Sequence, residues 1–249
     1  GGAKWRPFMT EPLPKVAVLC GGAGTRLKSW TDTVPKALVP IHGRPVIEHL
    51  LAHTVQEGFK EYVLCIGHKG DLIVDHFSQH PFPGARIEFS NAGTEASMLQ
   101  RLVAARKNFE DRLVVCYGDT ISDIRFGDLL AFHERSNALA TIATVSIRNP
   151  FGLVRFQDDG AAVSFDEKPV LHYYVGLSVI EAEAMDRYAT EDLVRQPDGA
   201  GLIEFFHRIM RDRRLYVYQH KGLQITFNTD TERKQAEDQL IRFYTQKES

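Results

Sequence analysis

The sequence predicts an α/β fold with three layers, in which helices cover both faces of a mostly parallel, mixed β-sheet. Two features predict this fold. Continuous apolar, β-branched runs at 16–20, 62–66 and 113–117 are typical of strands that are buried on both faces of a parallel sheet. Helical patterns separate these runs, and the alternation predicts right-handed crossovers in a Rossmann-like first half.

The predicted elements follow one another in a regular order. In the first half, apolar side chains at helical spacing predict helices at 46–56, 71–78 and 98–107, and an alternating pattern predicts a strand at 86–90. From residue 138 the predicted strands are 139–147, 153–156, 161–165, 173–180 and 215–219, and the predicted helices are 181–189, 202–212 and 231–246. We therefore expect one domain at 15–249, with halves at 15–137 and 138–249 on the same sheet, after a tail or tag remnant at 1–14.

Composition and charge exclude several classes of protein. The chain has 249 residues and a formal net charge of −2, so its charge balance does not indicate nucleic acid or an anionic membrane as a partner. No apolar run approaches the roughly 20 residues that span a bilayer, and we expect no signal peptide. We expect a cytoplasmic protein. The sequence leaves its oligomeric state open, with a homo-oligomer as one alternative.

Two groups of potential metal ligands are predicted to be structural. Cys20, Cys65 and Cys116 lie at or near the ends of predicted strands without CxxC spacing, and we expect them to be buried core residues. His49 and His53 lie four residues apart on the predicted helix at 46–56, away from its apolar stripe. Because no third ligand accompanies them, we predict a solvated helix face there.

The segment after the first predicted strand has the chemistry of an anion site. It reads Gly21, Gly22, Ala23, Gly24, Thr25 and Arg26. Glycines leave backbone N–H groups open to a ligand, and clustered N–H groups bind anions. The guanidinium of Arg26 matches phosphate oxygens, and Lys36 adds a second cation ten residues further on, directly after a proline. The segment therefore predicts a site for a triphosphate.

Two common phosphate-binding patterns do not fit this segment. Leu27 stands where the P-loop pattern GxxxxGK[ST] needs a glycine. Leu27 also replaces the third glycine of the dinucleotide fingerprint, and the second strand ends in Ile66-Gly67-His68, without the acid that binds a ribose. These differences argue against a nicotinamide-binding reductase.

A longer pattern carries a family resemblance. The segments are GGAGTRL (21–27), PKALVPI (35–41), GFKEYVLCIGHKGDLIVDHF (58–77), YGDTISDI (117–124), FGLVRF (151–156), DEKP (166–169) and TDTER (229–233). They resemble the sugar-1-phosphate nucleotidyltransferases, which move a nucleoside monophosphate from an NTP to a sugar phosphate, and glucose-1-phosphate cytidylyltransferases most of all. The resemblance implies a nucleotide-diphospho-sugar transferase fold, with a nucleotide-binding first half and an acceptor-binding second half. It also implies an NTP, with CTP favoured, a phosphorylated sugar and Mg²⁺ as ligands.

The resemblance also implies roles for single residues. Arg26, Lys36 and Asp119 would be catalytic, and Asp119 and Asp230 would bind the metal ion. Asp119 follows a buried strand, so it is also expected from its position at the carboxyl edge of the sheet, where ligands bind in such folds. Nucleotide-binding residues would be Gly21, Gly22, Ala23, Gly24, Thr25, Arg26, Glu95 and Gly118, and acceptor-binding residues would be Lys168, Glu167 and Gly176.

Each of these charged residues has a structural alternative. Asp119 fits a turn and Asp230 fits a helix N-cap. Lys168 and Glu167 fit a solvated charge pair in a loop. Arg26 and Lys36 face the same alternative of a solvated surface charge.

The chain departs from the cytidylyltransferase pattern at several places. Leu99 and Gln100 replace two glycines of the base-recognition segment between Glu95 and Arg101. The loop after DEKP is short and lacks the family's asparagine, so His172 and Tyr173 are candidates to line the pocket of a different acceptor. The aromatic segment before the second metal-binding aspartate is also replaced, by 222–225. Alternatives are therefore a guanylyltransferase for a heptose, cyclitol or other phosphate, and a catalytically silent nucleotide-binding relative with a regulatory role.

Overall fold

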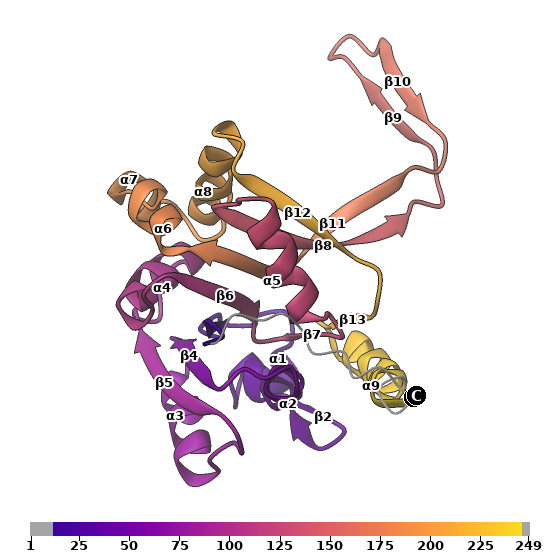
Figure 1. Cartoon of the computed structure of the whole chain (residues 1–249). Coiled ribbons are helices and arrows are strands. Elements are labelled where there is room, and N and C mark those ends of the chain that lie inside the picture. The colour runs from indigo at the N-terminus through magenta and orange to yellow at the C-terminus, as the bar shows by residue number, and fades with distance from the viewer. Residues whose placement is uncertain (1–11, 246–249) are drawn as a thin grey trace, which may run out of the picture.

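A computed structural model describes residues 12–245, and its core is a seven-stranded mixed sheet (Figure 1). In spatial order the strands are β12 (Leu215–His220), β8 (Ala140–Arg148), β11 (Val170–Glu181), β6 (Arg112–Tyr117), β1 (Lys15–Leu19), β4 (Glu61–Ile66) and β5 (Arg86–Asn91). Neighbouring strands run parallel except at β11, which is antiparallel to both β6 and β8. The predicted mixed, mostly parallel sheet is therefore confirmed.

Helices cover both faces of this sheet, as the three-layer prediction requires. One face carries α2 (Val46–Gln56), α3 (Gly70–Gln79) and α5 (Phe126–Arg135), and the other carries α4 (Met98–Ala105), α6 (Ala182–Tyr188), α7 (Glu191–Val194) and α8 (Ala200–Arg211). The central strand β1 explains why two cores form. Its side chains alternate, so Val16 and Val18 join the first core while Ala17 and Leu19 join the second.

A third apolar cluster holds the C-terminal helix α9 (Asp230–Thr245) against the first half of the chain. The short elements around it are α1 (Lys28–Thr31), η1 (Lys36–Leu38), β2 (Pro40–Ile41), β3 (Arg44–Pro45), β7 (Thr120–Ser122) and β13 (Gln224–Thr226), and η2 (Arg106–Asn108) follows α4. Ala236, Leu240 and Phe243 of α9 are buried in this cluster. The last helix therefore packs on its own domain.

The prediction of a solvated histidine face on α2 is wrong. His49 and His53 are both buried. The His49 ring bonds to the Ile41 carbonyl at 3.1 Å and to the Tyr244 hydroxyl at 2.7 Å, and the His53 ring bonds to the Ile124 carbonyl at 2.8 Å. The reason is tertiary: α9 and the chain after β7 cover the side of α2 that faces away from the sheet. Burial lowers the pKa of His49, which favours the neutral ring.

Two of the predicted strands of the second half lie outside the seven-stranded sheet. The strands β9 (Leu153–Phe156) and β10 (Ala162–Asp166) form a separate two-stranded hairpin. Figure 1 shows this hairpin at the end of long extensions of β8 and β11, away from the body of the molecule. These extensions pair as far as Val170 with Arg148, so the hairpin continues them outward instead of folding back.

The boundary between the tail and the domain and the boundary between the two halves stay predictions. The boundary at 137/138 falls in the connection between α5 and β8, and residues 1–11 of the expected tail lie outside the described residues. All three predicted core cysteines are buried, as expected. Among residues 12–245, no helix is both long enough and apolar enough to cross a membrane.

Candidate functional site

The glycine loop lines a pocket of about 590 Å³ at the carboxyl ends of β1 and β6. The three glycines of the loop meet different structural requirements. Gly24 has a φ of +60°, a conformation that side chains disfavour, and its carbonyl accepts a hydrogen bond from Thr31 at 3.0 Å. A Cβ on Gly22 would meet no atom within 4 Å, so Gly22 leaves space open. A Cβ on Gly21 would lie 2.3 Å from Cζ of Arg101, so Gly21 accommodates a side chain of the protein itself.

Arg101 ties three segments of this site together. It is buried on α4 and donates hydrogen bonds to four backbone carbonyls: Ile66 at 2.7 Å, Gly93 at 3.0 Å, Gly21 at 3.2 Å and Thr94 at 3.2 Å. Its guanidinium, with five donors in a fixed plane, suits such a multiple contact. The end of β4, the glycine loop and the loop before α4 are thereby fixed relative to one another.

The two residues that replace family glycines before Arg101 have structural roles. Gln100 forms a capping box with Ser97 at the start of α4: its side chain accepts from Ser97 N at 2.7 Å, and its own N–H donates to Ser97 Oγ at 3.2 Å. Leu99 is fully buried in the core under α4. Neither position therefore provides the close backbone approach to a ligand that glycines would allow.

The predicted catalytic charges converge on one side of the pocket. Nζ of Lys36 lies 2.5 Å from Oδ2 of Asp119 and also donates to Oδ1 of Asn228 at 3.0 Å. Nη2 of Arg26 donates to the same Asn228 oxygen at 3.0 Å. The glycine loop and η1 thus meet two segments that lie more than 80 residues further along the chain, the end of β6 and the segment before α9. Gly118 joins them, since its N–H donates to the Leu19 carbonyl at 2.9 Å.

Asp230 lies at the start of α9, and the alternative that it caps this helix is wrong. The residue before it, Thr229, accepts a hydrogen bond from Glu232 N at 3.2 Å, as an N-cap does. The Asp230 carboxylate instead accepts a hydrogen bond from Ser29 Oγ at 2.5 Å. Asp230 is not among the residues that line the pocket, whereas Asp119 is. Its role as a second metal ligand stays a prediction.

The donor set of this pocket suits a magnesium ion that is shared with phosphate groups. Among the described residues, no group of three or more His, Cys, Asp or Glu side chains is arranged to hold a metal ion. Magnesium does not require one, because it commonly binds one or two carboxylates and completes its shell with phosphate oxygens and water. Asp119 offers one such carboxylate, which in this structure is balanced by Lys36.

The three predicted acceptor residues lie outside this pocket. Glu167 and Lys168 are exposed beyond the outer end of β11, with Lys168 Nζ 3.8 Å from Glu167 Oε1. At about 3.3 Å per residue, Lys168 lies up to roughly 25 Å along the chain from Gly176, which is level with the end of β6. Gly176 has a φ of +72°, and a Cβ there would lie 2.4 Å from the ring of Tyr117, which does line the pocket. Gly176 therefore leaves room for the Tyr117 ring, and it affects the pocket through the position of that ring.

The sequence did not single out several residues that line the pocket. They are His68, Thr94, Met98, Tyr117, Asp198 and Asn228. Asp198 comes from the segment before α8 and accepts a hydrogen bond from Met98 N at 3.0 Å. For Asn228 a signal existed, because it lies two residues before a predicted metal ligand. Asp198 lies in a polar segment with no motif, so only the packing of α8 against α4 brings it here.

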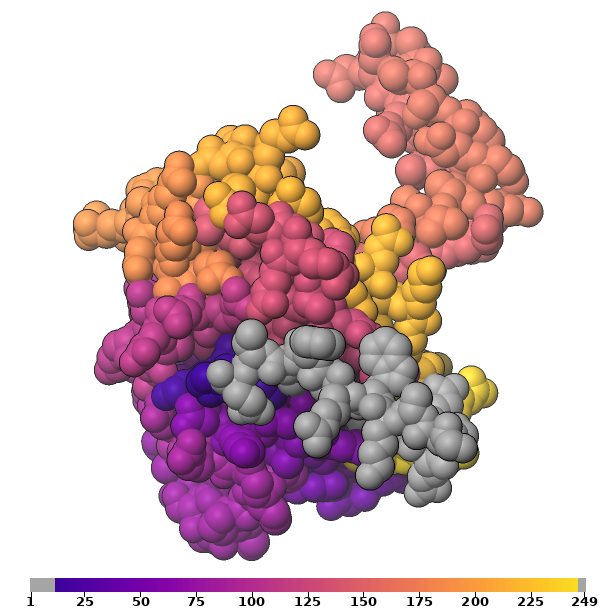
Figure 2. Space-filling view, viewed as in Figure 1, coloured from indigo at the N-terminus to yellow at the C-terminus, as the bar shows by residue number. Residues whose placement is uncertain are grey.

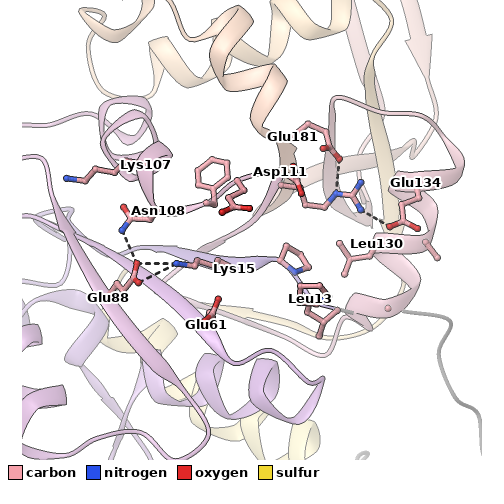
Figure 3. A pocket seen from close by; sticks show the side chains of 17 residues that line it. Leu13, Lys15, Glu61, Glu88, Lys107, Asn108, Asp111, Leu130, Glu134 and Glu181 are labelled. Carbon is pink, nitrogen blue, oxygen red and sulfur yellow. Dashed lines mark hydrogen bonds and ion pairs between the residues drawn. The ribbon is translucent and has the colours of Figure 1, made fainter. Parts of the chain in front are cut away.

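A second, larger cavity of about 1020 Å³ lies at the opposite edge of the sheet (Figure 3). Five of its charged side chains pair with one another: Lys15 with Glu88 at 3.4 Å, and Arg112 with Glu134 and Glu181 at 2.7 and 2.8 Å. Six acidic side chains and three basic ones line it. This excess of negative charge disfavours a polyphosphate, so we place the functional site at the glycine loop.

The fold and this site together define a class: an α/β protein of the nucleotide-diphospho-sugar transferase type. The sequence matches the family described as "Nucleotidyl transferase" over residues 15–241. Because the match covers most of the chain, this protein belongs to the nucleotidyl transferase family, and it is an enzyme of the sugar-phosphate nucleotidyltransferase type.

Individual relatives agree with this family and differ in the base they use. The "Probable glucose-1-phosphate cytidylyltransferase" of Bacillus subtilis is 25% identical over 238 residues, which cover 86% of this chain and 91% of the relative. The D-glycero-alpha-D-manno-heptose 1-phosphate guanylyltransferase of Campylobacter jejuni is 30% identical over 155 residues, 61% of this chain and 67% of the relative. Other curated relatives are longer, and the chain spans 50% and 35% of two of them.

A solved structure shows the same fold. HddC from Yersinia pseudotuberculosis, complexed with GMP-PN, superposes with a TM-score of 0.68 at 19% identity. The superposition covers 92% of this chain and 100% of HddC. At this identity the likeness establishes the fold alone.

Proposed function

We propose that this enzyme transfers a nucleoside monophosphate from CTP to a sugar 1-phosphate and releases pyrophosphate. One observation carries the proposal: Arg26, Lys36 and Asp119 converge beside the glycine loop, in a pocket at the carboxyl edge of the sheet. Two cations and backbone amides suit a triphosphate, and a carboxylate suits the metal ion that accompanies it.

The proposed reaction is a direct displacement. A phosphate oxygen of the sugar phosphate attacks the α-phosphorus of the NTP, one new P–O bond forms, and the bond to pyrophosphate breaks. The acceptor phosphate is already ionised at neutral pH, so the step needs no side-chain nucleophile and no strong general base. Catalysis then depends on positioning and charge neutralisation.

Two cations have different tasks in this scheme. Arg26 and the loop amides hold the leaving pyrophosphate, while Lys36 neutralises the α-phosphate. The ion pair between Lys36 and Asp119 shows how the protein balances these charges before substrate binds. In the proposed complex, Lys36 would exchange its carboxylate partner, Asp119, for a phosphate oxygen of the NTP. Asn228 bridges Arg26 and Lys36 and keeps their spacing.

We also propose Mg²⁺ as the cofactor, which Asp119 would help to hold. When bound, the ion neutralises charge on the phosphates. Asp230 accepts a hydrogen bond from Ser29 and does not line the pocket, whereas Asp119 does, so we regard Asp119 as the main protein ligand.

The preference for CTP rests on sequence similarity, and glucose 1-phosphate is the acceptor named for the Bacillus subtilis relative. The cytidylyltransferase of Bacillus subtilis is matched along most of its length. A specific observation favours a second candidate, a guanylyltransferase for a heptose or another non-glucose phosphate. Leu99 and Gln100 serve the core and the helix cap instead of opening the base-recognition segment, and a heptose guanylyltransferase is 30% identical. The cytoplasmic location stays a prediction.

The test is a pyrophosphate-release assay with Mg²⁺, in which CTP, GTP, UTP, ATP and dTTP are each combined with a panel of sugar phosphates. We expect turnover with CTP and glucose 1-phosphate. Turnover only with GTP and a heptose phosphate would establish the second candidate. No turnover with any pair, together with tight NTP binding, would indicate a catalytically silent relative.

The Asp119→Asn variant tests the role of the carboxylate. We expect it to lower kcat by at least about 100-fold while the fold persists, because Asp119 is only partly buried. Asp75→Asn, on the exposed side of α3, removes one carboxylate elsewhere and is the matched control. Wild-type turnover of Asp119→Asn would refute the assignment.

A further inference from the structure

The short ribbon of β7 and β13 carries several of the groups that surround Lys36. Its two strands pair antiparallel over three residues each. Asp119 directly precedes β7, and Phe227 and Asn228 directly follow β13, so the three lie at the same end of the ribbon. Nζ of Lys36 bonds to Asp119 at 2.5 Å and to Asn228 at 3.0 Å, and it lies 5.4 Å from the centre of the Phe227 ring. The position of this end of the ribbon therefore decides where Lys36 and Asp119 stand.

A histidine–carboxylate pair closes the other end of the ribbon. Nε2 of His220, the last residue of β12, lies 2.8 Å from Oδ1 of Asp123 and 3.2 Å from the carbonyl oxygen of Leu223. A carboxylate and a carbonyl both accept hydrogen bonds, so Nε2 carries the proton and donates to them. The Asp123 N–H donates to the same Leu223 carbonyl at 3.3 Å. Since Asp123 directly follows β7 and Leu223 directly precedes β13, these bonds join both strands to the edge of the seven-stranded sheet.

His220 and Asp123 are tightly enclosed. His220 is buried, and 22% of the Asp123 side chain is exposed. Burial alone would raise the pKa of Asp123, but the hydrogen bond and the charge of His220 lower it overall, which keeps the carboxylate ionised. A Cβ on Gly222 would lie 2.3 Å from Oδ1 of Asp123 and 2.7 Å from Cε1 of His220. Glycine at position 222 therefore leaves the room that this pair needs.

The chain between β12 and β13 lies at the surface. Lys221 and Gly222 are exposed, and Figures 1 and 2 show this connection below the extensions of β8 and β11. A two-stranded ribbon is marginally stable alone, so it depends on the groups that fasten it to the domain. Ile121 and Ile225, which pair with each other, are buried in the third apolar cluster and hold the middle of the ribbon. The bonds of His220 tie its end to the sheet.

We propose that His220 and Asp123 are positioning residues for the transfer reaction, which fix the β7–β13 ribbon so that Asp119 and Lys36 keep the arrangement needed at the α-phosphate. The proposal rests on the proposed function, because it assigns the pair to the same reaction. Neither His220 nor Asp123 lines the nucleotide pocket. They act along the ribbon instead, since Asp123 lies roughly 13 Å along the chain from Asp119.

This arrangement predicts which kinetic constant changes when the pair is broken. The ribbon places the groups that act on the α-phosphate, where charge develops in the transition state. The glycine loop, which binds the pyrophosphate end of the NTP in the proposed scheme, is held separately by the hydrogen bond from Arg101 to the Gly21 carbonyl. A loosened ribbon should therefore lower kcat and leave NTP binding nearly unchanged.

The first test compares kcat with the Kd of the NTP well below the Tm of each variant. We expect His220→Ala and Asp123→Ala to lower kcat about 10-fold while Kd stays within about twofold. Asp123→Asn keeps an oxygen acceptor for Nε2 and should retain most of kcat. The control His76→Ala breaks another histidine–carboxylate contact, 2.7 Å to Glu48 on α2, and should leave kcat unchanged. Wild-type kcat in both alanine variants, even with a lowered Tm, would overturn the proposal.

The second test follows the ribbon itself by hydrogen exchange with mass spectrometry. Gly222→Ala keeps both partners but forces them apart, and it should act like His220→Ala. In both variants the amides of residues 119–123 and 223–228 should exchange faster than in wild type, while those of β1 and β6 should not. A wild type without turnover would refute the proposed function, and the exchange pattern would still decide whether the pair fixes the ribbon. Wild-type exchange of the ribbon in both variants would overturn the proposal.

Discussion

Replacing Arg101 should loosen the nucleotide site by releasing the segments that this side chain holds. Its guanidinium donates to the carbonyls of Ile66, Gly21, Gly93 and Thr94, and the side chain is buried. A hydrogen bond with one charged partner contributes about 1.5–3 kcal/mol, so four give a simple sum of about 6–12 kcal/mol. The loss should be smaller than this sum, because the Gly21 and Gly93 carbonyls also accept hydrogen bonds from other backbone N–H groups. We therefore expect Arg101→Met to lower the free energy of unfolding by about 3 kcal/mol.

The measurement is urea unfolding followed by circular dichroism, together with the Kd of the NTP from calorimetry. Arg101→Lys keeps the charge but has a single ammonium in place of the planar fork, so it should recover only part of the stability. The Kd should rise in both variants, because the glycine loop loses its anchor to the loop before α4. Wild-type stability and wild-type Kd in Arg101→Met would refute the reasoning.

A double-mutant cycle measures the interaction between Arg101 and Gly21 directly. Gly21→Ala should be destabilising by itself, because the new Cβ would lie 2.3 Å from Cζ of Arg101. In the Arg101→Ala background that space is free, so Gly21→Ala should cost little. We expect an interaction energy of about 1–2 kcal/mol between the two positions. Gly22→Ala is the control, since its Cβ meets no atom within 4 Å, and additive effects of the Gly21 and Arg101 substitutions would contradict the geometry.

Three further predictions concern the rest of the domain. Burial alone would raise the pKa of Glu181, but its hydrogen bond with His133 and the charge of Arg112 lower it overall. A lowered folded-state pKa contributes stability above the unfolded value near 4.5 that is lost as pH falls through the folded value. Glu181→Gln should therefore lower the free energy of unfolding at pH 7 by about 1–3 kcal/mol, as measured by urea unfolding. This difference from wild type should shrink as pH falls below about 4. A difference that stays constant with pH would contradict the prediction. Gly176→Ala should lower Tm and displace the Tyr117 ring, because its φ is positive and the Cβ would strike that ring; a crystal structure with the ring unmoved would argue against this role. Burial raises the pKa of all three cysteine thiols, so the thiols of the native protein should react slowly with a thiol reagent at pH 8. All three thiols should react only after unfolding, and fast labelling of the native state would show an opened core.

Sequence reasoning was strongest where local pattern decides the structure. Apolar runs predict most strands of the seven-stranded sheet, because a strand buried on both faces needs apolar side chains throughout, and an alternating pattern predicts the edge strand β5. No helix or strand is predicted between residues 118 and 137, where the structure has β7 and α5. For α5 a signal existed, since Phe126, Leu129, Leu130 and His133 are buried at helical spacing.

Contiguous residues and their spacing predict the sheet, the helices on its two faces and the chemistry of the glycine loop. Which distant side chains meet depends instead on the packing of the whole elements. Packing of α4 places Arg101 against Gly21, the segment before α9 places Asn228 between Arg26 and Lys36, and the extension of β8 and β11 carries Lys168 away from the pocket. The physical reason is that such contacts depend on how whole elements pack, which no local pattern of polar and apolar residues encodes.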